Sequence, residues 1–120
     1  MNRRGVRCGT VEPVFARLHT LSTTPEQAEQ GREIVTSVYL PWARECTGFR
    51  GLIRLVSAEA GTTLVFTLWA DEAALEASAE AAEDFGLRIA EATGATYRAL
   101  EDFEVNLFDV EDAAIRPERP

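Results

Sequence analysis

Apolar side chains recur with two different periods between Pro13 and Val110. In some stretches they occupy every second position, as in a β-strand, and in others they lie three and four positions apart, as in an amphipathic helix. The strand pattern covers residues 14–21, 52–56, 63–69 and 97–110. The helix pattern covers two stretches, one that begins at Thr24 and one that begins at Asp71. The predicted order is strand, helix, strand, strand, helix, strand.

Local signals predict where the two helices begin, bend and end. Thr24 offers a side-chain oxygen to free backbone N–H groups, Pro25 suits a first turn, and Gln27 can complete a capping box. Pro41 lacks the N–H that a helix interior needs, so we expect a bend between Ser37 and Pro41. The glycines that follow the two helical patterns are expected to end them: Gly48 and Gly94.

The order of elements predicts an α+β fold of the ferredoxin-like type, βαββαβ, with an antiparallel sheet and two helices. Right-handed crossovers place both helices on the same face of the sheet. The second helix has a mostly small inward stripe: Leu75, Ser78, Ala82, Phe85, Ile89 and Ala92. The other face of the sheet receives no helix.

The segment 63–69 offers apolar side chains to both faces of the expected sheet. A sheet with helices on only one face should alternate apolar and polar residues, and this run does not. Burial of Leu64, Phe66 and Leu68 against a second copy of the chain contributes roughly 1.5–3 kcal/mol for each side chain. We therefore expect a two-fold homodimer in which two sheets face each other, a dimeric α/β barrel. The alternative is that the terminal segments shield this face.

Composition excludes several partners and chemistries. The net charge of −8 repels phosphate backbones and anionic lipids, so neither nucleic acid nor a membrane is expected as a partner. The chain contains no lysine, which excludes Schiff-base catalysis and a phosphate-loop lysine. No apolar run is long enough to cross a bilayer or to form a signal-peptide core. A cytoplasmic protein is expected.

The length of 120 residues fits one domain, which we expect over residues 13–110 with flexible tails at 1–12 and 111–120. Cys8 and Cys46 are too few for a disulfide framework, and Cys46 is expected to be a small buried hydrophobe. A single histidine, His19, excludes a metal site built from several histidines.

Two short motifs resemble those of a known family. Gly48 and Phe49 precede the second strand. A tryptophan, a helix cap and a helix start follow one another in a second motif: Leu68, Trp69, Ala70, Asp71, Glu72, Ala73, Ala74 and Leu75. On these residues the chain resembles the antibiotic biosynthesis monooxygenase-like domains, which are dimeric α/β barrels. The family includes cofactor-free oxygenases that act on polycyclic phenols, haem-degrading enzymes and many proteins of no known activity.

The resemblance implies a role for one tryptophan and departs from the family at three positions. Trp69 corresponds to the family's pocket tryptophan and is a candidate catalytic residue; the alternative is a core tryptophan that closes the end of the sheet. Val65 and Leu75 stand where the anthrone-oxidising members have an asparagine and a tyrosine. Ala79 stands where the haem degraders have a histidine, so neither haem nor another cofactor is expected.

His19 is the other candidate catalytic residue, because only histidine has an ordinary pKa close to neutrality. On the first strand it shares a face with Phe15 and Arg17. It can act as a general base or serve as a hydrogen-bonded structural residue.

The candidates for substrate binding are Tyr39, Trp42, Arg17, Arg54 and Asn106. The two aromatic residues lie beside the predicted bend and can line a cavity or fill the helix core. The two arginines can hold a phenolate or carboxylate, or can pair with the acidic residues at 101, 102 and 104. The asparagine can face the cavity from the last strand or support the hydrogen bonding of that strand.

The resemblance, taken with these residues, implies a cofactor-independent monooxygenase-like enzyme that acts on a small aromatic metabolite of the polyketide type. One alternative is a non-catalytic ligand-binding or accessory protein of the same fold. Another is a cyclase or isomerase that uses His19 as a base without oxygen. A cavity filled by side chains favours the binding protein, whereas an open cavity with convergent polar groups favours the enzyme.

Overall fold

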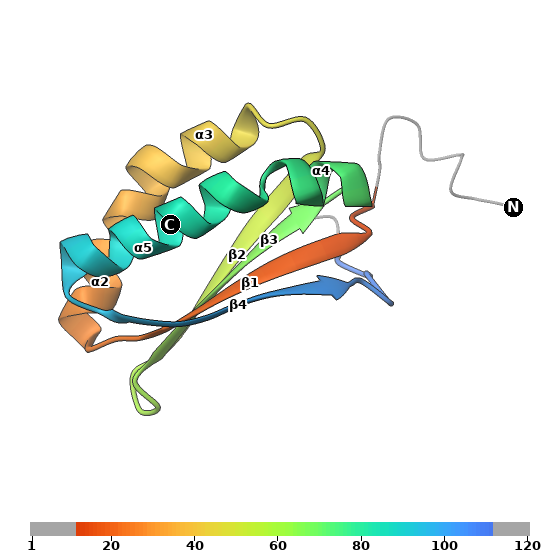
Figure 1. The fold of residues 1–120 in the computed structure, drawn as a ribbon. Helices are drawn as coiled ribbons and strands as arrows, with labels where there is room; N and C mark the ends of the chain where they lie inside the picture. The colour runs from red at the N-terminus through yellow and green to blue at the C-terminus, as the bar shows by residue number, and fades with distance from the viewer. Residues whose placement is uncertain (1–11, 112–120) are drawn as a thin grey trace, which may run out of the picture.

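The computed structural model describes residues 12–111, and the predicted ferredoxin-like α+β fold is confirmed. The strands are β1 (Phe15–Ser22), β2 (Phe49–Ser57), β3 (Thr62–Trp69) and β4 (Thr96–Glu104). The helical elements are α2 (Pro25–Ile34), a π-helical turn (Val35–Tyr39), α3 (Leu40–Arg44), α4 (Glu72–Ala77) and α5 (Ala79–Thr93). The sheet is antiparallel in the order β2-β3-β1-β4, and the helices cover one of its faces (Figure 1).

The strand register assigns each residue of β1 and β3 to one face of the sheet. His19 lies opposite Val65, and Phe15 lies opposite Trp69. These residues, together with Arg17, belong to the face that the helices cover, and the shared face predicted for Phe15, Arg17 and His19 is confirmed. The other face is apolar and carries Leu18, Ile53, Leu55, Leu64, Phe66, Leu68 and Phe103.

The first helix begins as predicted. Thr24 accepts a hydrogen bond from the Gln27 backbone N–H, and the Gln27 side chain accepts one from the Thr24 backbone N–H. The expected irregularity before Pro41 takes the form of the π-helical turn. Beside this turn the hydroxyls of Thr36 and Ser37 donate to the Arg32 and Glu33 carbonyls, one turn earlier. Pro41 therefore reshapes the helix without ending it.

The second helix begins at the predicted cap, where Asp71 accepts a hydrogen bond from the Ala74 backbone N–H. It is interrupted at Ser78, because the Arg17 guanidinium donates to the Leu75 carbonyl and to the Ser78 hydroxyl. This interruption shifts the buried stripe in the last turns, where Ala90 is buried and Ala92, expected to face inward, is exposed. Gly94 ends the helix with a φ of 86°.

The last strand is shorter than predicted. It ends at Glu104 instead of Val110, and one further backbone hydrogen bond joins the Val105 N–H to the Val14 carbonyl. Beyond this point the neighbouring chain offers Pro13, which has no N–H to donate. Asn106 therefore lies past the strand and is exposed, and its expected placement on the last strand is wrong.

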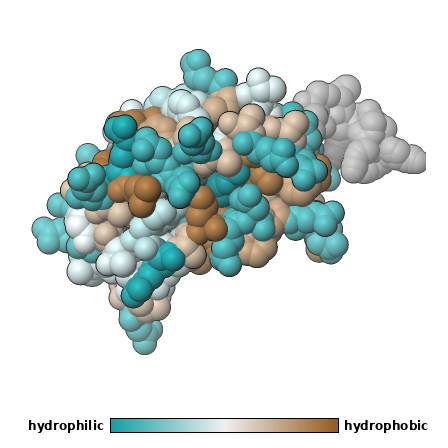
Figure 2. All heavy atoms as spheres, in the orientation of Figure 1, coloured by the Kyte–Doolittle hydropathy of each residue, from teal (hydrophilic) through white to brown (hydrophobic). Residues whose placement is uncertain are grey.

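The surface over the helices is mostly hydrophilic, with small and separate hydrophobic patches (Figure 2). Among residues 12–111, no helix is long and apolar enough to cross a membrane. Residues 1–11 and 112–120, which make up most of the two predicted tails, lie outside the described residues.

Candidate functional site

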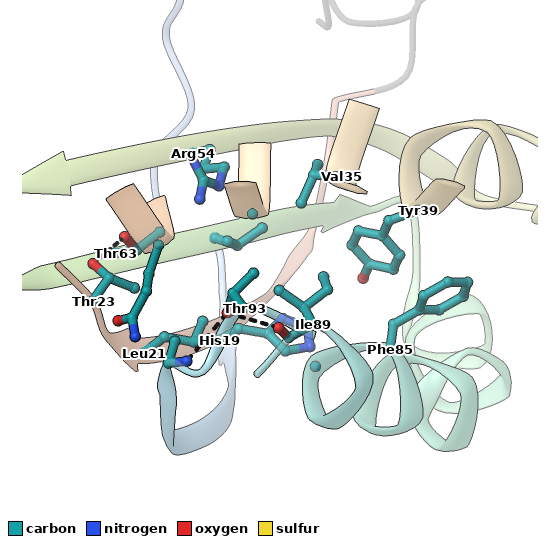
Figure 3. A pocket seen from close by; sticks show the side chains of 15 residues that line it. His19, Leu21, Thr23, Val35, Tyr39, Arg54, Thr63, Phe85, Ile89 and Thr93 are labelled. Carbon is teal, nitrogen blue, oxygen red and sulfur yellow. Dashed lines mark hydrogen bonds between the residues drawn. The ribbon is translucent and has the colours of Figure 1, made fainter. Parts of the chain in front are cut away.

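A narrow cavity lies between the helix-covered face of the sheet and the helices above it (Figure 3). Its lining comes from β1, β2, β3, α2, the π-helical turn and α5. The free volume is about 20 Å³, which is room for about one water molecule. Three of the predicted site residues meet there: His19, Tyr39 and Arg54.

His19 is held on β1 as a neutral imidazole. Its side chain is buried, and Nε2 lies 3.0 Å from the Ala82 carbonyl oxygen on α5. A carbonyl can only accept a hydrogen bond, so Nε2 carries the proton and Nδ1 holds the free lone pair. Burial lowers the pKa of His19, and the bond to Ala82 offsets only part of this effect. At neutral pH the ring is therefore an uncharged base.

Tyr39 reaches the cavity from the last residue of the π-helical turn. Its side chain is buried, and its hydroxyl has no hydrogen-bond partner among the described residues. Its ring packs against Phe85 and Trp42, with centroids 4.9 and 5.6 Å away. Burial raises the pKa of Tyr39 to about 12, so the hydroxyl stays protonated and can donate a hydrogen bond at neutral pH.

Arg54 enters the cavity from β2, and Figure 3 shows its guanidinium beside the space that Tyr39 also enters. One nitrogen, Nη2, donates to the Ala28 carbonyl at 2.8 Å, whereas Nε is buried and has no partner among the described residues. Burial lowers the pKa of Arg54, and the nearby charge of Arg32 lowers it further. A Cβ on Gly31 would lie 2.9 Å from Nη2, so the glycine provides the space for this guanidinium.

The buried polar side-chain atoms without a partner, within residues 12–111, gather in this region. They are Nδ1 of His19, the hydroxyls of Tyr39 and Tyr97, and Nε of Arg54. Tyr97 stacks on His19 with ring centroids 6.0 Å apart. Folded proteins pair nearly all such atoms, and a cluster of unpaired ones needs an explanation.

Arg17 lies on the same face as His19 but does not line the cavity. It is almost fully buried, and its nitrogens donate to the Asp102 carboxylate, the Ser78 hydroxyl and the Leu75 carbonyl. The ion-pair alternative is therefore the arrangement found, with Asp102 as the acidic partner. A guanidinium with all of its sides engaged is poorly suited to hold a substrate.

The two tryptophans lie near the cavity without lining it. Trp69 is fully buried, donates to the Thr67 hydroxyl at 2.9 Å, and packs with Leu75, Phe15 and Phe49 at the end of the sheet. Trp42 is half-buried and stacks on Tyr39. Trp69 thus has the position of a core tryptophan that closes the end of the sheet, which was the alternative to a pocket residue. Trp42 packs against the face of the Tyr39 ring.

Sequence reasoning missed three residues that shape the site: Phe85 as a lining residue, Gly86 and Tyr97. A Cβ on Gly86 would lie 2.8 Å from the His19 ring and 2.9 Å from the Tyr97 hydroxyl, so only glycine lets α5 approach these rings. A glycine inside a helix lowers helix stability unless packing requires it, so the position of Gly86 within the helical pattern was the signal that could have pointed to a close approach there.

Among residues 12–111, no group of three His, Cys, Asp or Glu side chains is placed so that it could hold a metal ion. Cys46 is half-buried, packs beside the Trp69 cluster, and lies with its sulfur 3.7 Å from the Trp42 carbonyl. Burial raises the pKa of Cys46, which makes the thiol less reactive.

Comparison with known proteins gives matches at the level of structure. No protein family model and no curated protein matches the chain. A monooxygenase from the gene ActVA-Orf6 of Streptomyces coelicolor, solved with nanaomycin D, is 16% identical with a TM-score of 0.63, over 82% of this chain and 91% of that chain. SnoaB, a cofactor-independent oxygenase from Streptomyces nogalater, is 19% identical with a TM-score of 0.52, over 85% of this chain and 100% of that chain.

Other matching structures have no stated activity. A dimeric ferredoxin-like protein from an uncultured marine organism is 17% identical with a TM-score of 0.61, over 82% of this chain and 100% of that chain. A further match, from Nitrosomonas europaea, is described as a protein of unknown function. Together the matches show that this chain shares the ferredoxin-like fold of these solved structures, among which are two described as putative antibiotic biosynthesis monooxygenases.

Proposed function

We propose that this protein is a cofactor-independent monooxygenase-like enzyme that acts on a small aromatic metabolite of the polyketide type, with His19 as its general base. The observation that carries this proposal is the gathering of unpartnered polar atoms of His19, Tyr39 and Arg54 around one cavity. A buried polar group without a partner costs roughly 1–3 kcal/mol. A ligand that carries hydroxyl or carbonyl oxygens on a flat ring would satisfy these atoms and fill the apolar remainder.

The proposed chemistry begins with proton transfer to Nδ1 of His19. The substrate carbanion then reduces oxygen directly, as an anthrone does when its ring methylene becomes a carbonyl. One atom of O₂ enters the product, and the other leaves as water with two hydrogens from the substrate. Tyr39, which stays protonated, donates a hydrogen bond to the developing oxyanion.

Three of the matched structures support this proposal. One is a monooxygenase solved with nanaomycin D, and another is named a cofactor-independent oxygenase. A third is described as dimeric, which supports a two-fold homodimer for this chain as well. The exposed apolar side chains of Ile53, Leu55 and Phe103 on the open face of the sheet support the same assembly.

The size of the cavity favours a second candidate, a non-catalytic ligand-binding or accessory protein. A free volume of about 20 Å³ is far below the roughly 300 Å³ typical of a ligand pocket. An aromatic substrate therefore enters only if lining side chains such as Phe85 and Tyr39 move apart. A cyclase or isomerase with His19 as base remains the third candidate and requires no oxygen.

The test is turnover of anthrone by the purified protein in air, followed by absorbance of the anthraquinone product. We expect His19→Gln to lower the rate by about 100-fold or more, because general bases contribute that much. Glutamine keeps an N–H that can donate to Ala82 but provides no base. Because burial lowers the pKa of His19, the wild-type rate should stay level down through its ordinary value of 6.5 and fall only at a pH below that value, where the folded ring becomes protonated.

Two controls separate the candidates. Arg88→Gln, on the exposed side of α5, should leave the rate unchanged. Removal of oxygen should stop the oxygenase but not a cyclase or isomerase. A wild-type rate no higher than that of buffer, or one that His19→Gln leaves intact, contradicts the proposed enzyme; ligand binding without turnover favours the accessory protein.

A further inference from the structure

We propose that Arg54 and Arg32 form an anion-binding entrance to the cavity, and that the ligand carries a carboxylate which Arg54 holds there. The inference rests on the proposed function only for the aromatic body of the ligand. It assigns the substrate class, an aromatic carboxylate, and one specificity-determining residue.

Arg54 borders two separate spaces. The inner one is the narrow cavity with His19 and Tyr39. The outer one is an open groove of about 330 Å³ along β2, beside α2 and the π-helical turn. Arg54 and Val35 line both spaces, and Figure 3 shows these two side chains along one border of the inner cavity. A ligand that passes from the groove to His19 therefore meets the Arg54 guanidinium.

The charge of Arg54 has no ionic partner in the described part of the chain. Its hydrogen bond goes to a neutral carbonyl, that of Ala28, and Nε is left without one. This differs from Arg17, the other arginine of the sheet face, which pairs with Asp102. Buried or half-buried charges are normally paired. The missing partner at Arg54 is therefore best supplied by a ligand.

The outer groove has the charge that such a ligand needs. Its lining holds two arginines, Arg32 and Arg54, and no acidic residue, although the whole chain has a net charge of −8. Arg32 forms no ion pair within residues 12–111, and its charge disfavours the protonated state of Arg54. The nearby carboxylate of Glu29 has the opposite effect and raises the pKa of Arg54. An anion between the two guanidinium groups would relieve their mutual repulsion.

Apolar groups complete the groove, which argues against a small inorganic anion. Leu40, Leu52 and Val56 line it together with Val35. A molecule with an apolar ring and one carboxylate matches both kinds of lining. Its carboxylate would accept hydrogen bonds from Arg54 while its ring points toward His19.

The experiment compares a carboxylate ligand with its uncharged ester, 6-hydroxy-2-naphthoate and its methyl ester, which is one methyl group larger, by isothermal titration calorimetry at neutral pH. We expect the acid to bind at least about tenfold more tightly than the ester, because hydrogen bonds to charged groups are the strong ones. Arg54→Met should reduce this preference to within about twofold, and Arg54→Lys should retain part of it. Arg32→Gln should weaken binding of the acid by a few-fold and reduce its salt dependence.

The matched control is Arg88→Gln, which removes an exposed arginine on α5 and should leave both affinities unchanged. Equal affinity of the wild-type protein for acid and ester overturns the inference, as does a preference that survives in Arg54→Met or the absence of binding by both ligands. Selective binding of the acid without any turnover would refute the proposed enzyme and leave the inference standing. Equal binding of acid and ester, with turnover of neutral anthrone that Arg54→Met leaves intact, would refute the inference and leave the proposed enzyme standing.

Discussion

Two properties of His19 make the free energy of unfolding depend on its protonation. Its ring is buried at 3% exposure, and its folded-state pKa lies below the ordinary value of 6.5. The unfolded chain therefore binds a proton more readily than the folded chain as the pH falls below about 6.5. Protonation thus destabilises the fold in this window, and the contribution is fully present above it.

We predict that the free energy of unfolding falls more steeply for the wild type than for His19→Gln between about pH 7.5 and 5.5. The carboxylates titrate in both proteins, so the difference between the two slopes isolates His19. Urea denaturation at each pH measures it. Parallel slopes would mean that the ring titrates in the folded protein as it does in water.

Arg17 illustrates the opposite arrangement, a buried cation whose partners all come from the protein. Asp102 lies 3.0 Å from its Nε, with side-chain exposures of 1% for the arginine and 48% for the aspartate. Removal of the aspartate leaves the guanidinium with neutral partners only, the Ser78 hydroxyl and the Leu75 carbonyl. A buried charge that loses its partner costs about 3–5 kcal/mol when both groups are dry.

We expect Asp102→Ala to lower the free energy of unfolding by about 2 kcal/mol, less than that range because the carboxylate is half exposed to water. The exposed pair of Arg88 and Asp84 supplies the control, and Asp84→Ala should cost no more than about 0.5 kcal/mol. The double variant Arg17→Met with Asp102→Ala should recover part of the loss. Urea denaturation decides, and a double variant less stable than Asp102→Ala would contradict this account.

The sequence alone identified three of the residues that meet at the cavity: His19 and Arg54 by their chemistry on predicted strands, and Tyr39 by its place beside the bend at Pro41. It left Arg17 open between two roles, because period two places His19 and Arg17 on one face without stating what lies above each. The difference comes from Ser78 and Asp102, which are 61 and 85 positions away in the chain. No local pattern reports contacts at such separations.

At the scale of elements, two buried glycines offer a matched comparison. A Cβ added to Gly31 in α2 would lie 2.9 Å from the tip of Arg54, a flexible group, whereas one added to Gly86 in α5 would lie 2.8 and 2.9 Å from the His19 and Tyr97 rings. Alanine favours a helix over glycine by about 1 kcal/mol at either site. The guanidinium can move away, but the stacked rings are fixed by their neighbours.

We therefore predict that Gly31→Ala is at least as stable as the wild type, and that Gly86→Ala is less stable by about 1 kcal/mol or more. Overpacking of the rings outweighs the gain in helix propensity only at the second site. Thermal unfolding followed by circular dichroism measures both, with about 4–8 °C expected for each kcal/mol. A Gly86→Ala protein more stable than Gly31→Ala would show that the rings yield easily.

Helix boundaries were predictable because their signals are local. Thr24 and Asp71 cap the helices as expected, and Gly94 ends the last one. Three boundaries were missed: the first helical stretch ends at Arg44, four residues before the expected Gly48, and the other two boundaries depend on distant residues. The break at Ser78 needs the Arg17 guanidinium, and the end of β4 depends on where β1 begins.

At the scale of the whole molecule, the sequence predicted the layers but not the volume between them. The inward stripe of small residues suggested that α5 lies close to the sheet, and Gly86 brings it close enough to reduce the cavity to about 20 Å³. That volume depends on six elements packed together, so no single segment encodes it. The open face of the sheet, by contrast, was readable from β3 alone, because alternate residues point to opposite sides.

The open face leads to the last prediction, a homodimer that a single charge should disrupt. Ile53, Leu55 and Phe103 are 45–49% exposed there, around the half-buried Phe66. Burial of each such side chain contributes roughly 1.5–3 kcal/mol, and apolar side chains grouped on one face of a sheet are typical of an interface between subunits.

We expect light scattering to give twice the chain mass for the wild type and the single mass for Phe66→Glu, because a dry interface cannot accept an unpaired carboxylate. Leu87→Glu is the control, since Leu87 is 50% exposed on α5, within the helix layer that covers the other face. That variant should keep the double mass. A wild type that scatters as one chain at micromolar concentration would contradict the dimer, and would leave the apolar face of β3 to be covered by a segment of the same chain.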